Sequence, residues 1–410
     1  MVSSVVVVHG DPLVPALLLF GDSVVDVGNN NNLQTLVKAN FLPYGRDFNT
    51  HRPTGRFSNG KLATDFTAEY LGFTSYQPAY LSQEARGRNI LTGVNFASAA
   101  SGYYEPTAQL YGALTLARQL EYYRDWQRKV VSMVGREKAN AIFSGGIHLI
   151  SAGTSDFIQN YYINPLLRVY SPDQFSDILM RSYSTLIQNL YSIGARRIGV
   201  TALPPTGCLP AAITLFGSGS NQCVARLNQD AVSFNNKLNT TSQYLKTKLP
   251  GLKLVVFDIY QPLLDMITKP SDSGMLKVFT RSQDDLTLLH EHMTILSALN
   301  STQGKYLTKG NKMRIHTPNA PKEVSASHSL LLIVIQMYLT DFILISRILR
   351  IKKSLLWTGI IETSFLCNTR SVGTCSNATE YVFWDGFHPS EAANEKLAQD
   401  LLEQGFDLIS

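Results

Sequence analysis

Short apolar runs of strand length recur along the chain, at residues 14–20, 93–97, 146–152, 197–202 and 252–258. Runs of four to eight apolar residues bounded by Gly, Pro or polar residues are typical of buried strands. We therefore predict a strand at each of these five positions.

Longer segments with helical periodicity lie between or after these runs. Residues 114–134, 172–193 and 225–247 place apolar side chains three and four positions apart, and 390–408 forms a last helix that begins near Ser390 and Glu391. Alternating strands and helices predict a parallel sheet with helices on both faces, which is an α/β fold.

The first apolar run ends in Gly21-Asp22-Ser23, followed by a polar stretch rich in Gly and Asn. Because the carboxyl ends of parallel strands face the crevice where open α/β sheets bind ligands, Ser23 stands where a nucleophile is expected. The alternative is an ordinary turn between strand and helix that happens to contain a serine.

Near the other end of the chain, Asp385 precedes His388 by three residues in a loop with Gly386 and Pro389. A serine nucleophile needs a base to take its proton, and the base needs a partner that fixes its tautomer. Asp385 and His388 are candidates for these roles. The alternative is that Asp385 caps the following helix while His388 is a solvated loop residue.

Five ordered blocks make the chain resemble the plant GDSL esterase/lipases of the SGNH hydrolase superfamily. The blocks are Phe20-Gly21-Asp22-Ser23 with Asp26 to Asn30, Gly93 to Gly102, Ile150 to Phe157, Gly194 to Cys208, and Asp385 to Pro389. The resemblance covers residues 13–274 and 358–410. It implies a three-layer α/β/α, flavodoxin-like fold with a central parallel sheet, in one domain with an atypical insertion.

The same resemblance implies site residues and an activity: Ser23 as nucleophile, His388 as general base and Asp385 as its orienting partner. The oxyanion hole would consist of the N–H groups of Ser23 and Ala100 and the side chain of Ser155. Ala100 stands where many relatives have glycine, and Ser155 where they usually have asparagine. The implied reaction is hydrolysis of carboxylic esters, either lipid acyl or acetyl esters, through an acyl-enzyme.

Two alternatives to the hydrolase remain open: an acyltransferase with the same triad, and an inactive relative disabled by the insertion. The expected partner is a small-molecule or lipid ester, or an acylated wall polymer. No cofactor, metal, nucleic acid or stable protein partner is implied. The chain has no G-x-S-x-G motif, which disfavours the α/β-hydrolase fold proper. His148, inside a strand pattern, is interpreted as a core histidine.

The insertion, residues 275–357, holds eleven Lys and Arg against five Asp and Glu, while the whole chain has a net charge of +5. The basic character thus belongs to the insertion and is no nucleic-acid signal. Its abrupt change of composition favours translated non-coding sequence, such as a retained intron or an error in the gene model. The alternatives are a cap helix and a membrane helix at 330–349, which a central Asp341 disfavours.

The remaining signals concern export. Residues 1–12 resemble a truncated signal segment, and the family resemblance implies an extracellular or cell-wall location. The spacing of the pairs Cys208/Cys223 and Cys367/Cys375 suits local disulfides, with free thiols as the alternative. Asn239, Asn300 and Asn377 match the pattern of glycosylation sites.

Overall fold

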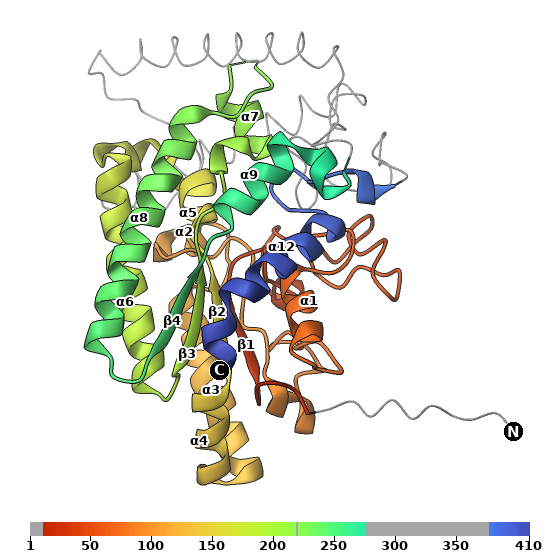
Figure 1. Ribbon diagram of the computed structural model, residues 1–410, viewed down its shortest axis with the longest axis vertical. Helices are drawn as coiled ribbons and strands as arrows, with labels where there is room; N and C mark the ends of the chain where they lie inside the picture. Colours follow the sequence, from red (N-terminus) through yellow and green to blue (C-terminus); the bar gives the residue numbers. More distant parts are fainter. Residues whose placement is uncertain (1–10, 219, 276–376) are drawn as a thin grey trace, which may run out of the picture. The chain divides into compact units, whose positions relative to one another are not determined.

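The computed structural model describes residues 11–218, 220–275 and 377–410. Within these residues, four parallel strands form one sheet in the order β1-β2-β3-β4. The strands are β1 (Leu17–Gly21), β2 (Ile147–Ser151), β3 (Arg197–Thr201) and β4 (Lys253–Phe257). Figure 1 shows the strands side by side with helices on either side of the sheet, which is the predicted α/β/α arrangement.

The helices of the described residues vary from a single turn to seven turns. They are α1 (Ala63–Tyr70), α2 (Glu105–Leu110), α3 (Leu116–Val134), α4 (Arg136–Gly145), α5 (Thr154–Asp156), α6 (Pro172–Ser192), α7 (Pro210–Phe216), α8 (Ala225–Lys248), α9 (Tyr260–Thr268), α12 (Glu391–Gln404) and α13 (Phe406–Ile409). None of these described helices is long and apolar enough to cross a membrane.

Four of the five predicted strands are confirmed as β1 to β4. The fifth, at 93–97, is reduced to isolated bridges of Asn95 with Leu19 and Ala79. Its backbone still pairs with β1, since Leu19 N–H donates to Val94 O at 3.2 Å and Phe96 N–H donates to Leu19 O at 2.7 Å. The Asn95 side chain ends the regular ladder by accepting the N–H of Ala97 at 2.9 Å, so the segment continues as a loop.

The predicted helices are confirmed as α3, α6, α8 and α12. Ser390 is the N-cap of α12 and accepts the N–H of Ala393 at 3.2 Å. The last predicted helix is divided in two, because α12 ends at Gln404 and the short α13 follows Gly405. The prediction of a single domain over residues 13–274 and 358–410 is not tested, because part of it lies outside the described residues. The predictions for residues 1–12 and 275–357 also fall mostly outside the described residues.

The strands bury both of their sides, as expected for a parallel sheet. We call the side covered by α3, α6 and α8 the first face, and the side covered by α1, α12 and α13 the second face (Figure 1). The first face carries the larger core, with Leu18 and Phe20 of β1 among its members. The second face carries a smaller cluster that includes Leu17, Leu19 and Phe257.

His148 points into the first face and is a satisfied core residue, as predicted. Its Nδ1 lies 3.3 Å from the carbonyl oxygen of Arg197, which can only accept, so Nε2 accepts the hydroxyl of Tyr123 at 2.9 Å. Burial lowers the pKa of His148 to about 4. A neutral imidazole therefore belongs to the core at neutral pH.

Cys208 and Cys223 form a disulfide that closes the loop containing α7, so the predicted local pairing is present in the structure. Asn239, on α8, and Asn377 are exposed. The predictions for Cys367, Cys375, Asn300 and the segment 330–349 lie outside the described residues.

Candidate active site

The turn after β1 presents Ser23 at the carboxyl end of the sheet. Gly21 has a φ of 133°, and a Cβ on it would lie 1.9 Å from the carbonyl oxygen of Ser151 on β2. Only glycine therefore fits at this close approach. Asp22 N–H then donates to the same Ser151 oxygen at 2.9 Å, which holds the turn at the end of β2.

A buried amide from α3 supports this turn. Gln119 Oε1 accepts the N–H of Gly21 at 2.9 Å, and its Nε2 donates to the carbonyl oxygen of Gly21 at 2.9 Å. Sequence reasoning did not find Gln119. The sequence feature that could have indicated it is a polar residue on the apolar stripe of an amphipathic helix, because a buried amide at such a position needs hydrogen-bond partners.

Asp385 and His388 lie in a tight loop just before α12. Trp384 N–H donates to the carbonyl oxygen of His388 at 2.8 Å, which closes the loop. Asp385 Oδ1 accepts the backbone N–H groups of Phe387 and His388 at 2.8 and 2.9 Å. The acid therefore organises the loop that carries the histidine.

Three side chains from the two ends of the chain form one hydrogen-bonded series. His388 Nδ1 lies 2.8 Å from the Asp385 carboxylate, and His388 Nε2 lies 2.7 Å from Ser23 Oγ. A carboxylate only accepts, so Nδ1 carries the proton and Nε2 faces the serine hydroxyl as an acceptor. All three residues are at most 7% exposed. Ser390, not Asp385, caps α12, so the reading of Asp385 as a helix cap is wrong.

Two aromatic residues that sequence reasoning did not single out complete this arrangement. The hydroxyl of the buried Tyr44 donates to Asp385 Oδ2 at 2.8 Å. The ring of Phe57 lies 5.0 Å from the imidazole of His388. These contacts restrict both the carboxylate and the imidazole. Phe57 belongs to the polar loop at residues 52–61, which therefore packs against the histidine.

A small pocket of about 20 Å³ lies at the serine hydroxyl. Its lining includes Ser23, His388 and Ser155, so the structure brings Ser155 to the reacting side chains. Ala100 does not belong to this lining. The hydroxyl of Ser155 and the N–H groups of Ser23 and Ala100 make no hydrogen bond to another described residue.

Ala100 adopts a φ of 69°, in the left-handed region. That conformation costs an alanine about 1 to 2 kcal/mol and costs glycine much less. The backbone conformation at this position therefore favours glycine over alanine.

Side chains of the first block hold the second block in place. Asp26 Oδ2 accepts the N–H of Ala99 at 3.0 Å, next to Ala100. Asn29 Nδ2 donates to the carbonyl oxygens of Asn95 and Ala97 at 2.9 and 2.7 Å. Asn30 Nδ2 donates to the carbonyl oxygen of Ala99 at 3.1 Å. The Asn-rich stretch after Ser23 is the sequence feature that could have indicated these contacts between the two blocks.

Carboxyl groups behind the nucleophile are deeply buried. Burial raises the pKa of Asp22 to about 7, although the N–H of Val24 and the charge of His388 oppose the shift. Burial likewise raises the pKa of Asp156 to about 7, although it accepts hydrogen bonds from Tyr103 N–H and from Thr107, each at 2.7 Å. Near neutral pH these acids are therefore partly protonated and carry less negative charge than exposed carboxyl groups.

No group of three or more potential metal ligands occurs among the residues that the structure describes.

Comparison with known proteins identifies the family. The model of the GDSL-like lipase/acylhydrolase family matches residues 17–401. Two GDSL esterase/lipases of Arabidopsis thaliana are each 55% identical to this chain over 98% of its length and 94% of their own. A third from the same plant is 53% identical over 99% of this chain and 93% of its own length. The chain therefore belongs to the GDSL-like lipase/acylhydrolase family.

Proposed function

We propose that the protein hydrolyses carboxylic esters through an acyl-enzyme formed on Ser23. The family supports the class, since its members carry the names esterase, lipase and acylhydrolase. The observation that carries the finer proposal is the buried series Ser23 Oγ, His388 and Asp385, with separations of 2.7 and 2.8 Å. A serine hydroxyl, a base and an orienting acid at hydrogen-bond distance are the parts that acyl transfer needs.

Each chemical step has a residue in position for it. Ser23 Oγ attacks the ester carbonyl carbon while His388 Nε2 takes the hydroxyl proton. Asp385 holds the imidazolium by its Nδ1–H. The tetrahedral intermediate collapses by breaking the bond to the alcohol oxygen, which takes the proton from His388. A water molecule then attacks the acyl-Ser23 with His388 again as base, and the carboxylic acid leaves with Ser23 restored.

Negative charge develops on the former carbonyl oxygen and requires donors. The N–H groups of Ser23 and Ala100, which have no acceptor among the described residues, and the hydroxyl of Ser155 are the candidates. One such donor is typically worth about 3 to 4 kcal/mol of activation barrier. The short serine side chain replaces the longer amide expected from the resemblance, so Ser155 is the weakest of the three.

The proposed substrate is a small-molecule or lipid ester, or an acyl group on a wall polymer, and the proposed location is extracellular or in the cell wall. The small pocket lined by Ser23, Ser155 and His388 is the proposed place for the reacting carbonyl group. No cofactor takes part in the proposed cycle.

Replacement of the nucleophile tests the proposal directly. Ser23→Ala is expected to lower kcat for p-nitrophenyl acetate by about 10⁴-fold or more, and to abolish labelling by a fluorophosphonate probe. The matched control is Ser144→Ala on the exposed side of α4, which should behave as wild type. Substantial turnover by Ser23→Ala, or labelling of wild type at another serine, would contradict the mechanism.

A further inference from the structure

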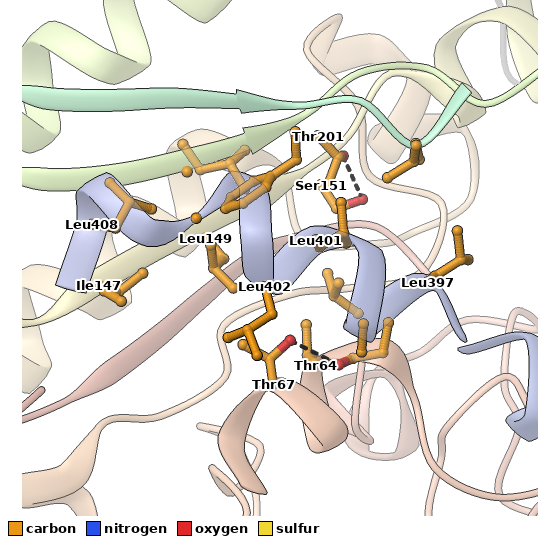
Figure 2. Close-up of a pocket in the computed structure, with 18 of the residues that line it drawn as sticks. Thr64, Thr67, Ile147, Leu149, Ser151, Thr201, Leu397, Leu401, Leu402 and Leu408 are labelled. Atoms are coloured by element: carbon orange, nitrogen blue, oxygen red, sulfur yellow. Dashed lines mark hydrogen bonds between the residues drawn. The ribbon is translucent and has the colours of Figure 1, made fainter. Parts of the chain in front are cut away.

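A second cavity, of about 100 Å³, lies between the second face of the sheet and helices α1, α12 and α13. Figure 2 shows Leu149 and Thr201 approaching it from the strands and Leu397 and Leu401 approaching it from α12. The cavity follows β2 from Ser151 to Ile147, a length of about 13 Å at 3.3 Å per residue.

This cavity begins beside the nucleophile. Val24, which follows Ser23 in the turn, lines both this cavity and the small pocket at the serine hydroxyl. Val25 and Ser151 also belong to the wall at this end. The two spaces therefore share one side chain as their boundary, and the cavity leads away from the reacting atoms along the sheet.

The walls offer almost nothing to a polar occupant. Of the few polar groups, Ser151 Oγ and Thr201 Oγ1 bind each other at 3.0 Å. Thr67 Oγ1 donates to the carbonyl oxygen of Ala63 at 2.9 Å, and Asn394 Nδ2 donates to that of Lys61 at 3.1 Å. The hydroxyl of Thr64 is buried without a partner among the described residues. A stable buried water needs two to four partners, so the space suits an apolar occupant.

We propose that this cavity binds the acyl chain of the ester substrate, an inference that rests on the proposed esterase function. With the carbonyl carbon at Ser23, the chain passes Val24 and continues between β2 and α12. A dry cavity of about 150 Å³ holds a benzene ring, so about 100 Å³ has room for roughly four carbons. Adding the carbonyl and the carbon next to it gives an unbranched chain of about six carbons.

A chain-length series provides the test. The ratio of kcat/KM for p-nitrophenyl hexanoate to that for the acetate should be high in wild type, because each buried methylene contributes roughly fourfold. Ala398 lies on α12 in the cavity wall and is buried. Ala398→Leu fills the cavity and should lower that ratio about tenfold or more. Ala392→Leu, on the same helix and outside the cavity wall, should keep the wild-type ratio.

A variant that enlarges the cavity, together with a binding measurement, distinguishes a change of the cavity from misfolding of Ala398→Leu. Leu397→Ala removes three carbon groups from the cavity wall and should move the preferred chain length upward by up to about three carbons, at roughly one added methylene per removed group. Inhibition of acetate hydrolysis by hexanoate should weaken about tenfold in Ala398→Leu, in line with the loss of burial.

The two proposals fail in different ways. Absence of acetate turnover and of fluorophosphonate labelling in wild type would overturn the esterase function. Normal acetate turnover with a flat chain-length profile, or a folded Ala398→Leu that keeps the wild-type hexanoate ratio, would overturn the acyl-chain site alone.

Discussion

The two faces of the sheet are covered by different kinds of packing. On the first face, the ring of Tyr123 lies 5.7 Å from that of Phe20 and 5.5 Å from that of Trp126, and all three residues are buried. On the second face, Ser151 and Thr201 line a cavity of about 100 Å³ beside α12. Aromatic rings pack closely on the first face, whereas the side chains on the second face leave a cavity.

Each face of the sheet supports a different part of the candidate site. Gln119, on a helix of the first face, holds the nucleophile turn through both polar groups of Gly21. The loop with Asp385 and His388 leads into α12 of the second face. The closely packed face thus positions Ser23, the proposed nucleophile, and the open face borders the proposed acyl-chain site.

Neighbouring leucines on opposite faces test the comparison most strongly. Leu18 is fully buried in the first face, and Leu149 lines the cavity on the second face and is half-buried. Leu18→Ala should lower the free energy of unfolding by about 4 kcal/mol, whereas Leu149→Ala should lower it by about 1 to 2 kcal/mol, because part of its surroundings is already empty. Denaturant unfolding measures both values. Equal losses would mean that the two faces are packed alike.

The buried carboxyl of Asp22 predicts a pH dependence of stability. Its pKa rises from 3.8 to about 7 on folding, so the folded state binds the proton more tightly, and this contribution is lost as pH rises from about 4 to about 7. Asp22→Asn removes that contribution. The stability of wild type relative to the variant should fall by about 2 to 4 kcal/mol between pH 4 and pH 8.

Thermal or denaturant unfolding of both proteins across this pH range measures the difference. His148, whose lowered pKa acts in the opposite direction, is present in both and cancels. A difference that does not change with pH would contradict a protonated Asp22.

Tyr44→Phe tests how the acid of the site is held. The hydroxyl donates to Asp385 Oδ2, so its loss removes one of the hydrogen bonds that hold the carboxylate in place beside His388. The kcat for p-nitrophenyl acetate should fall about tenfold, as expected for one hydrogen bond to a charged group.

Tyr191→Phe is the matched control, since its hydroxyl donates to the carbonyl oxygen of Pro250 far from the site. It should leave kcat unchanged. A kcat of Tyr44→Phe equal to that of wild type would mean that Tyr44 only fills space.

The smallest expected effect concerns Ala100. Ala100→Gly relieves the left-handed strain but adds backbone freedom to the unfolded chain, so stability should rise by only about 0.5 to 1 kcal/mol. Ester turnover should be retained, since the N–H group is unchanged. A loss of stability would show that the packing of the Ala100 methyl group contributes more free energy than the backbone strain at Ala100 costs.

The periodic pattern predicted most of the fold. The short continuous apolar runs correspond to β1 to β4, and the amphipathic segments correspond to α3, α6, α8 and α12. This agreement arises because the burial of a strand or of one helix face is encoded by residues close together in the sequence. The segment 93–97 was predicted as a strand and forms only bridges. Its pairing depends on the side chains of Asn29, Asn30 and Asn95, whose partners lie far away in the sequence.

The candidate site shows the same division. Ser23, Asp385 and His388 could be named from the sequence, because a strand–turn serine and an acid–histidine loop are short local patterns. Tyr44, Phe57 and Gln119 could not, since their roles arise from contacts with residues 98 to 341 positions away. The cavity beside α12 could not be predicted from the sequence either, because its volume depends on how the helices pack against the sheet.

Local chemistry thus determined the family, the sheet and the three candidate catalytic residues, because propensity, periodicity and short motifs act between near neighbours. The meeting of Ser23 with His388 across 365 residues, and the room left beside Val24, arose only when the strands and helices packed. Distances between remote side chains and the space between them are properties of that packing.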